Sequence, residues 1–316
     1  MLSSPTPSVA IVGAGAMGCL FAARLAEQGA RVTLVDVDRD RLATIGSQGI
    51  TLVDDKGSRT LAVGAQLAAE VAAPIDLLML FTKGMHSGAA VRSVAHLAEA
   101  KPVALTLQNG IGNAELLADT FGADHVLMGT AHVPADLSPP VTVETHGFGT
   151  LELGGLTEAA QAFAPDCAAL LERAGFPTRV AADVNVAVWE KVAFNAALNA
   201  VGMICEVPNA GVDNEPGRRI ATRVVDETVA VAAARGIHLN RDRIVATVDA
   251  ALREHAHHKA SMLQDREHGR PTEIETINGA VAREGARLGV PTPVCDTLTD
   301  LVRIIELAAR GGQGRP

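Results

Sequence analysis

The sequence predicts an α/β fold in which a doubly wound parallel sheet is followed by an all-α domain. Two observations predict it. Short apolar runs alternate with helical segments over the first half of the 316 residues, a pattern typical of a parallel sheet with helices on both faces. From about residue 184 strand patterns stop, and long Ala-rich segments with helical periodicity replace them, as in helical bundles. We therefore expect domains over residues 1–183 and 184–316.

The first half contains predicted strands separated by helices. The opening strand, Val9–Val12, leads through glycines into a helix over Ala16–Gln28. Further strands are predicted at Arg31–Val37, Leu77–Phe81, Val103–Leu107 and Val126–Met128. Two segments depart from this pattern. A hairpin is predicted over Ile50–Val63 around Asp54–Gly57, and Val141–Leu153 alternates, so we expect it to add strands at the sheet edge.

The second half is predicted to be helical. The predicted helices cover Val186–Val201, Gly217–Arg235, Arg241–Lys259, Thr272–Leu288 and Pro293–Ala309. His255 and His258 would share one face of the third of these helices. A zinc site needs more ligands than these two, and the widely separated cysteines show no metal-binding spacing. We therefore expect no metal.

The composition excludes several classes of function. The formal charge is −9 and aromatic residues make up only 3% of the chain, whereas nucleic-acid binding depends on clustered Lys and Arg and on aromatic stacking. The apolar stretch Val9–Ala23 is too short to span a membrane. The N-terminus lacks the basic and apolar regions of a secretory signal. We expect a cytoplasmic protein that binds a small molecule and neither nucleic acid nor a membrane.

A glycine-rich loop connects the first strand to the first helix. Its GxGxxG motif consists of Gly13, Ala14, Gly15, Ala16, Met17 and Gly18. The first glycine permits a tight turn, the second lets the backbone approach a pyrophosphate, and the third lets helix and strand pack closely. The helix N-terminus favours an anion there. The loop therefore predicts a Rossmann-type dinucleotide domain, and a glycine-rich turn without a ligand is the alternative.

Asp36, at the end of the second predicted strand, bears on the choice of cofactor. A carboxylate at this position accepts hydrogen bonds from a ribose 2′-OH and repels a 2′-phosphate, which favours NAD(H). Arg39 and Arg41 follow, and either could contact the 2′-phosphate of NADP(H). We expect both arginines instead to lie on a solvated helix face.

The most informative segment of the second half is Trp189–Asn199. Lys191, Asn195 and Asn199 are spaced by four residues and lie on one face of a helix that is otherwise largely apolar. Burial lowers the pKa of a lysine, as a general acid near neutral pH requires. Lys191 would then be a proton donor flanked by amides that hold a polar substrate. The alternatives are a solvent-facing polar stripe and a lysine paired with a structural carboxylate.

Other polar residues follow predicted strands, where ligands of doubly wound sheets bind. Asn109 follows the strand at Val103–Leu107, and Lys83 follows the strand at Leu77–Phe81. In the second half, Glu273 begins a predicted helix, whose positive end suits a carboxylate.

Together these segments resemble the ketopantoate reductase (2-dehydropantoate 2-reductase) family. The resemblance rests on GAGAMG, TKGM, LQNGIGN, WEKVAFNAALNAVGMICEVPN and SMLQD…GRPTEIETINGAV, which follow in this order between about residues 9 and 309. It implies a Rossmann-type domain followed by a helical domain similar to the C-terminal domain of 6-phosphogluconate dehydrogenase. It also implies that NADP(H) reduces ketopantoate to pantoate, a step of pantothenate biosynthesis, with the substrate bound between the domains.

The resemblance implies roles for individual residues. Lys191 would protonate the ketone oxygen, and Glu273 would orient the lysine and the substrate hydroxyl. The implied substrate contacts are Asn195, Asn199, Asn209, Ser261 and Asn109. The implied contacts near the nicotinamide are Lys83 and Asn109.

Two positions depart from the family pattern. Asp36 stands where the family commonly has a basic residue, so NAD(H) competes with the NADP(H) that the resemblance implies. His258 stands in place of a family asparagine, which leaves a different branched 2-oxo acid open as substrate. A dinucleotide-binding sensor without catalysis is the alternative of another class, although a sensor needs no proton donor such as Lys191. The aliphatic helices of the second half could form a homodimer face.

Overall fold

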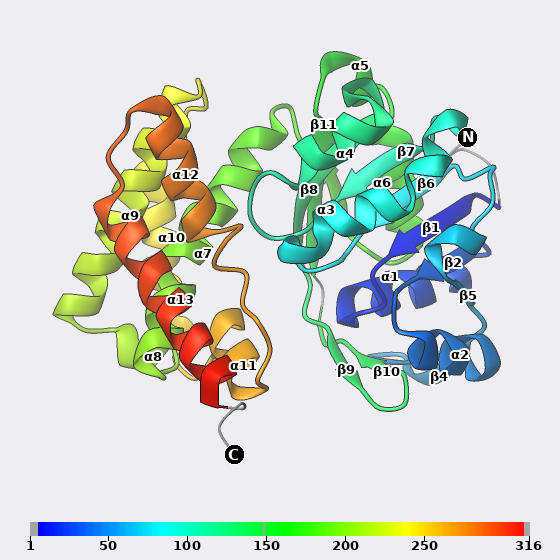
Figure 1. Ribbon diagram of the computed structural model, residues 1–316, viewed down its shortest axis with the longest axis horizontal. Coiled ribbons are helices and arrows are strands. Elements are labelled where there is room, and N and C mark those ends of the chain that lie inside the picture. Colours follow the sequence, from blue (N-terminus) through cyan, green and yellow to red (C-terminus); the bar gives the residue numbers. More distant parts are fainter. Residues whose placement is uncertain (1–5, 148, 313–316) are drawn as a thin grey trace. The chain divides into compact units, whose positions relative to one another are not determined.

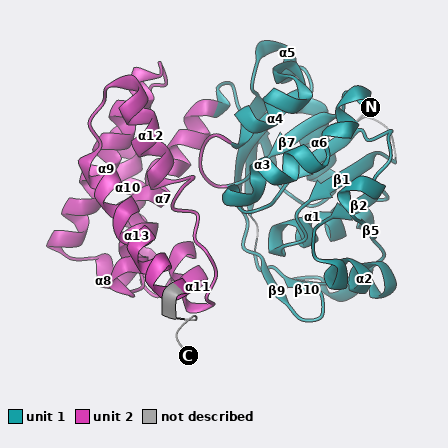
Figure 2. Ribbon diagram, viewed as in Figure 1, with its two compact units in different colours: residues 1–108, 113–184 teal, residues 109–112, 185–316 magenta. Residues whose placement is uncertain are grey.

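The computed structural model describes residues 6–147 and 149–312. The chain forms two compact units, each with its own hydrophobic core (Figure 1, Figure 2). The sheet unit comprises residues 1–108 and 113–184, and the helical unit comprises residues 109–112 and 185–316. The four residues 109–112 therefore belong with the helical unit, although the chain on both sides of them belongs to the sheet unit.

The sheet unit is built on an eight-stranded sheet. Its strands are β1 (Ser8–Val12), β2 (Arg31–Val35), β5 (Gly64–Gln66), β6 (Leu77–Leu80), β7 (Val103–Thr106), β8 (Val126–His132), β11 (Thr150–Gly155) and β12 (Thr178–Val180). They are ordered β12–β11–β8–β7–β6–β1–β2–β5. Only the pairing of β11 with β8 is antiparallel among these described strands. The central strands β6 and β7 are buried along their whole length, as strands covered on both faces are.

Among the described residues, six α-helices connect these strands. They are α1 (Ala16–Glu27), α2 (Arg39–Gln48), α3 (Gly84–Ser93), α4 (Asn113–Phe121), α5 (Glu158–Gln161) and α6 (Ala164–Arg173). α1 starts inside the glycine loop and is apolar on several sides, including Leu20, Phe21 and Leu25, all fully buried. This burial arises because α1 contacts the main sheet and also a second, small sheet.

The small sheet consists of β3 (Ile50–Asp54), β4 (Gly57–Leu61), β9 (Asp136–Ser138) and β10 (Thr142–Glu144), ordered β4–β3–β10–β9. The predicted hairpin is confirmed, because β3 and β4 pair in antiparallel fashion. The expectation that Val141–Leu153 adds strands at the edge of the main sheet is wrong. β10 pairs with β3, which buries Val143 beside Leu52, and β11 lies inside the main sheet between β8 and β12.

The described part of the helical unit contains helices and no strands. The helices are α7 (Val184–Cys205), α8 (Asn209–Val212), α9 (Glu215–Ala234), α10 (Arg241–Glu254), α11 (Ser261–Glu267), α12 (Asn278–Leu288) and α13 (Pro293–Gly312). Asn214 and Asn240 cap α9 and α10 by accepting hydrogen bonds from backbone N–H groups of the first turn. No helix among the described residues has the length and hydropathy needed to cross a membrane.

The predicted helix over Arg241–Lys259 ends five residues early, at Glu254. The backbone after it forms a turn, in which the carbonyls of Ala256 and His258 accept hydrogen bonds from the start of α8. His255 and His258 therefore do not share a helix face. In the described ranges no group of three His, Cys, Asp or Glu side chains could hold a metal ion.

Candidate functional site

The glycine loop after β1 has the geometry of a nucleotide-binding turn. Gly13 adopts a left-handed conformation (φ +110°) and lies so close to β6 that a Cβ there would be 2.8 Å from the Phe81 carbonyl carbon. A Cβ on Gly18 would lie 1.8 Å from the Gly13 carbonyl oxygen, so helix and loop can approach only without a side chain. A Cβ on Gly15 would meet nothing within 4 Å. Gly15 therefore leaves open space beside the N-terminus of α1, where a pyrophosphate fits.

Asp36 lies beside this loop. One carboxylate oxygen accepts a hydrogen bond from the Ala14 backbone N–H at 2.6 Å, and the other accepts from Val37 and Asp38 at 2.8 and 3.0 Å. These bonds fix the carboxylate next to the glycine loop. Arg41 reaches the same loop and donates to the Ala14 carbonyl at 3.2 Å. The expectation of a solvated helix face is confirmed for Arg39, which is exposed, but it holds only in part for Arg41, whose half-buried side chain turns back onto the loop.

The remaining loop residues lead into α1: Ala14 is buried, and Ala16 and Met17 are half-buried. Beyond the carboxyl ends of β6 and β7, Lys83 is half-buried at the start of α3. Close to it, a polar network that the sequence did not reveal joins these strand ends. The Gln108 amide donates to the Ser87 hydroxyl at 2.9 Å and to the Thr82 carbonyl, and it accepts from Thr106 at 2.9 Å.

Lys191 lies on α7 in the helical unit. Burial lowers the pKa of its ammonium group from 10.5 to about 8, and the charge of Glu273 opposes this fall. A lysine with such a pKa holds a proton at neutral pH and can release it, as a general acid must. Glu273 in turn accepts a hydrogen bond from the Asn109 side-chain amide at 3.1 Å. The helical unit therefore brings Lys191, Glu273 and Asn109 together.

Glu273 does not begin a helix, contrary to the sequence prediction. The helix predicted over Thr272–Leu288 starts at Asn278, because Ile277 leaves the helical conformation (φ −107°, ψ −97°). The carboxylate instead projects from a separate turn, whose backbone N–H groups at Thr276 and Ile277 bond to the Glu273 carbonyl. Asn278 is fully buried and ties the start of α12 to α7 by donating to the Ala196 carbonyl at 3.0 Å.

The polar stripe of α7 continues towards α11. Asn195 is half-buried and Asn199 is 5% exposed. The Asn199 amide donates to the hydroxyl of Ser261, the exposed first residue of α11, at 3.2 Å. Asn209 is also buried, but its amide donates to the Ala251 carbonyl, which packs α8 against α10. Asn199 and Ser261 thus form one polar cluster, whereas the described contacts of Asn209 are structural.

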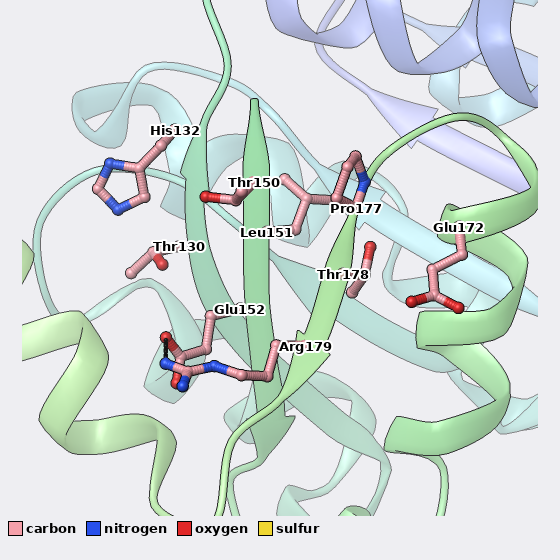
Figure 3. Close-up of a pocket in the computed structure, with 9 residues that line it drawn as sticks. All are labelled: Thr130, His132, Thr150, Leu151, Glu152, Glu172, Pro177, Thr178 and Arg179. Carbon is pink, nitrogen blue, oxygen red and sulfur yellow. Dashed lines mark hydrogen bonds and ion pairs between the residues drawn. The ribbon is translucent and has the colours of Figure 1, made fainter. Parts of the chain in front are cut away.

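Sizeable clefts also occur away from these residues. One cleft, of about 440 Å³, is lined by residues of β8, β11 and β12 and by Glu172 of α6 (Figure 3). Arg179 and Glu152 form an ion pair there, and Thr130, His132 and Thr150 also line the cleft. None of the predicted site residues lies there.

The family described as "Ketopantoate reductase PanE/ApbA" matches residues 9–158, and "Ketopantoate reductase PanE/ApbA C terminal" matches residues 183–306. A 2-dehydropantoate 2-reductase of Halobacterium salinarum is 33% identical over 300 residues, which cover 94% of this chain and 98% of that protein. Another from Pyrococcus horikoshii is 30% identical over 305 residues, covering 96% and 99%.

Solved structures give the same result. D-mandelate dehydrogenase with NADH and anilino(oxo)acetate has a TM-score of 0.90 at 29% identity, covering 96% of this chain and 99% of that one. A PanE/ApbA family ketopantoate reductase from Ralstonia eutropha has a TM-score of 0.87 at 29% identity, with the same coverage. The predicted fold class, a Rossmann-type sheet followed by helices, is therefore confirmed.

Proposed function

The chain belongs to the ketopantoate reductase family, and on this premise we propose that it reduces ketopantoate to pantoate with a reduced nicotinamide dinucleotide. It is an oxidoreductase that acts on CH–OH groups, as the named relatives are. The observation that carries the proposal is the cluster of Lys191, Glu273 and Asn109, because a ketone reductase needs a proton donor of suitable pKa held in place. The sequence contains no tyrosine that could take this role.

In the proposed reaction Lys191 is the general acid. The cofactor, when bound, supplies a hydride to the keto carbon, and the Lys191 ammonium group donates its proton to the ketone oxygen. As negative charge develops on that oxygen, the fixed cation stabilises it. Glu273 orients the ammonium group and accepts a hydrogen bond from a substrate hydroxyl. Asn199 and Ser261 offer donors to the carboxylate of the 2-oxo acid, and Asn195 lies on the same stripe.

The glycine loop fits the dinucleotide. The open space at Gly15 and the N-terminus of α1 suit the pyrophosphate, with Gly13 and Gly18 giving the turn its close packing. We propose NADH as the preferred cofactor, because the Asp36 carboxylate is held beside the loop and would repel a 2′-phosphate. D-mandelate dehydrogenase, a structural neighbour, binds NADH. Arg41, which also reaches the loop, is the feature that would favour NADPH.

The proposal is tested by following the absorbance of reduced nicotinamide with ketopantoate as substrate. 2-Oxoisovalerate and phenylglyoxylate serve as competing 2-oxo acids, each assayed with NADH and with NADPH. We expect the highest kcat/KM for ketopantoate with NADH. A higher kcat/KM for another 2-oxo acid would refute ketopantoate as the substrate. A clear preference for NADPH would refute the interpretation that Asp36 selects NADH. Cofactor binding without any turnover would indicate a sensor and refute catalysis.

A further inference from the structure

We propose that Asn109, Gly110 and Ile111, three residues of the segment 109–112 that we call the strap, position Glu273 relative to Lys191, and that Gly110 is the residue that makes this possible. Gly110 is a positioning residue, since it acts through Glu273. The inference rests on the proposed function, in which Lys191 is the acid. It concerns a segment whose sequence neighbours belong to the sheet unit while its own contacts lie in the helical unit.

Three contacts attach the strap to the turn that carries Glu273. The Asn109 amide donates to the Glu273 carboxylate at 3.1 Å, and the Ile111 backbone N–H donates to the Thr276 carbonyl at 3.0 Å. The Ile111 side chain also packs against the hydrophobic core of the helical unit. A side-chain hydrogen bond, a backbone hydrogen bond and an apolar contact together fix the position of the strap against the turn.

Gly110 allows the closest of these approaches. It is buried and left-handed (φ +88°), and a Cβ there would lie 2.2 Å from the Thr276 carbonyl oxygen and 2.7 Å from its carbon. These atoms are backbone, so they cannot rotate away. Any side chain at position 110 must therefore push the strap and the turn apart, which lengthens the bonds made by Asn109 and Ile111.

The displacement would reach Glu273, because the turn is compact. The Thr276 backbone N–H and hydroxyl both bond to the Glu273 carbonyl, at 3.1 and 3.3 Å. The turn is also held to α13, where Arg303 donates to both carboxylate oxygens of Glu275 at 2.7 and 2.8 Å. The turn is thus held by both the strap and α13. If the strap is displaced, the direction in which the Glu273 side chain points changes.

The same strap supplies a matched control. Gly112 is also left-handed (φ +97°), but it is exposed and a Cβ there would meet nothing within 4 Å. Gly110→Ala and Gly112→Ala therefore share the strain of alanine in a left-handed conformation, and only Gly110→Ala separates the strap from Thr276. The comparison removes backbone strain as an explanation.

Steady-state kinetics of the whole protein provide the first measurement. We expect Gly110→Ala to lower kcat for ketopantoate about tenfold or more with a smaller change in KM, since precise placement of an acid affects the reacting state, and Gly112→Ala to keep kcat within about twofold. The alkaline limb of the pH profile should move to lower pH in Gly110→Ala, because Lys191 loses the carboxylate that keeps it charged. Equal loss in both variants would overturn the proposal.

A second measurement does not depend on turnover. The pH dependence of Lys191 acetylation by acetic anhydride, read by mass spectrometry, reports protonation of its amine in each variant. We expect the midpoint to fall in Gly110→Ala and in Asn109→Ala, and to stay unchanged in Gly112→Ala. Asn109→Ala keeps the backbone intact, so it answers the question if Gly110→Ala fails to fold. If the acetylation midpoint is unchanged in the folded variants, the positioning role of the strap is refuted. If the midpoint falls in these variants but the wild type does not turn over ketopantoate, only the proposed function is refuted.

Discussion

Replacing Lys191 with methionine removes the ammonium group and keeps an unbranched apolar chain of similar length. If Lys191 is the general acid, kcat should fall by about 10²-fold or more, the usual contribution of a positioned acid. In the wild type, kcat/KM for reduction should fall above about pH 8, where Lys191 loses its proton. The methionine variant should lack this alkaline limb, because it has no group there to titrate.

The same substitution should stabilise the fold at neutral pH. The pKa of Lys191 falls from 10.5 to about 8 on folding. At about 1.4 kcal/mol per pKa unit, the charged amine in this poorly hydrated site destabilises the folded state by ~3 kcal/mol. Below pH 8 the amine is charged in both the folded and the unfolded chain, so this cost is fully present. Between pH 8 and 10.5 the folded protein has lost the proton that the unfolded chain still binds, and the cost disappears.

We therefore expect Lys191→Met to raise the free energy of unfolding by about 1–3 kcal/mol at neutral pH, with the gain shrinking as the pH rises to 10.5. Urea unfolding across this pH range measures it. Lys259→Met is the control, because Lys259 is exposed and pairs with Glu267 at 2.6 Å, a kind of pair worth only about 0–1 kcal/mol. Near-normal turnover in Lys191→Met, or a stability difference that does not depend on pH, would refute the argument.

Four further substitutions test the cofactor and substrate contacts. Gly18→Ala should destabilise the fold and weaken cofactor binding, since its Cβ would lie 1.8 Å from the Gly13 carbonyl oxygen; Gly15→Ala should keep the melting temperature and weaken only cofactor binding. Calorimetric titration and thermal melts separate the two, and equal melting temperatures would contradict the packing argument. Asp36→Asn should raise the Kd of NADH about tenfold, the scale of one charged hydrogen bond, without weakening NADPH; equal losses for both cofactors would count against a ribose contact. Asn199→Ala should raise KM for ketopantoate about tenfold while kcat changes less, and an unchanged KM would remove it from the substrate contacts.

Local patterns in the sequence were sufficient for most of the fold. The alternation of apolar runs predicted the central strands, and the spacing of Lys191, Asn195 and Asn199 predicted a polar stripe on one long helix, α7. Both patterns repeat within a few residues, so they depend on local geometry alone. The strands expected at the sheet edge were less predictable, because β10 instead pairs with β3 across about 90 residues, which no local pattern specifies.

The site was predictable as a set of residue types and less so as a geometry. Glu273 was expected at a helix start, yet it projects from a turn, because Ile277 leaves the helical conformation. Arg41 was expected in solvent, yet it folds back onto the glycine loop. In both cases the side chain makes a hydrogen bond to a segment distant in sequence, and helical periodicity contains no information about such bonds.

The position of Asn109 has a consequence for how such a protein can be assembled from parts. Its amide, bonded to Glu273, is encoded 164 residues upstream of that glutamate. Exchanging the C-terminal halves of two such proteins near residue 184 would transfer Lys191 and Glu273 together. Asn109, the third residue of the cluster, would not be transferred. A chimera joined near residue 184 would therefore have a complete helical core but an incomplete acid site, unless residues 109–112 are exchanged as well.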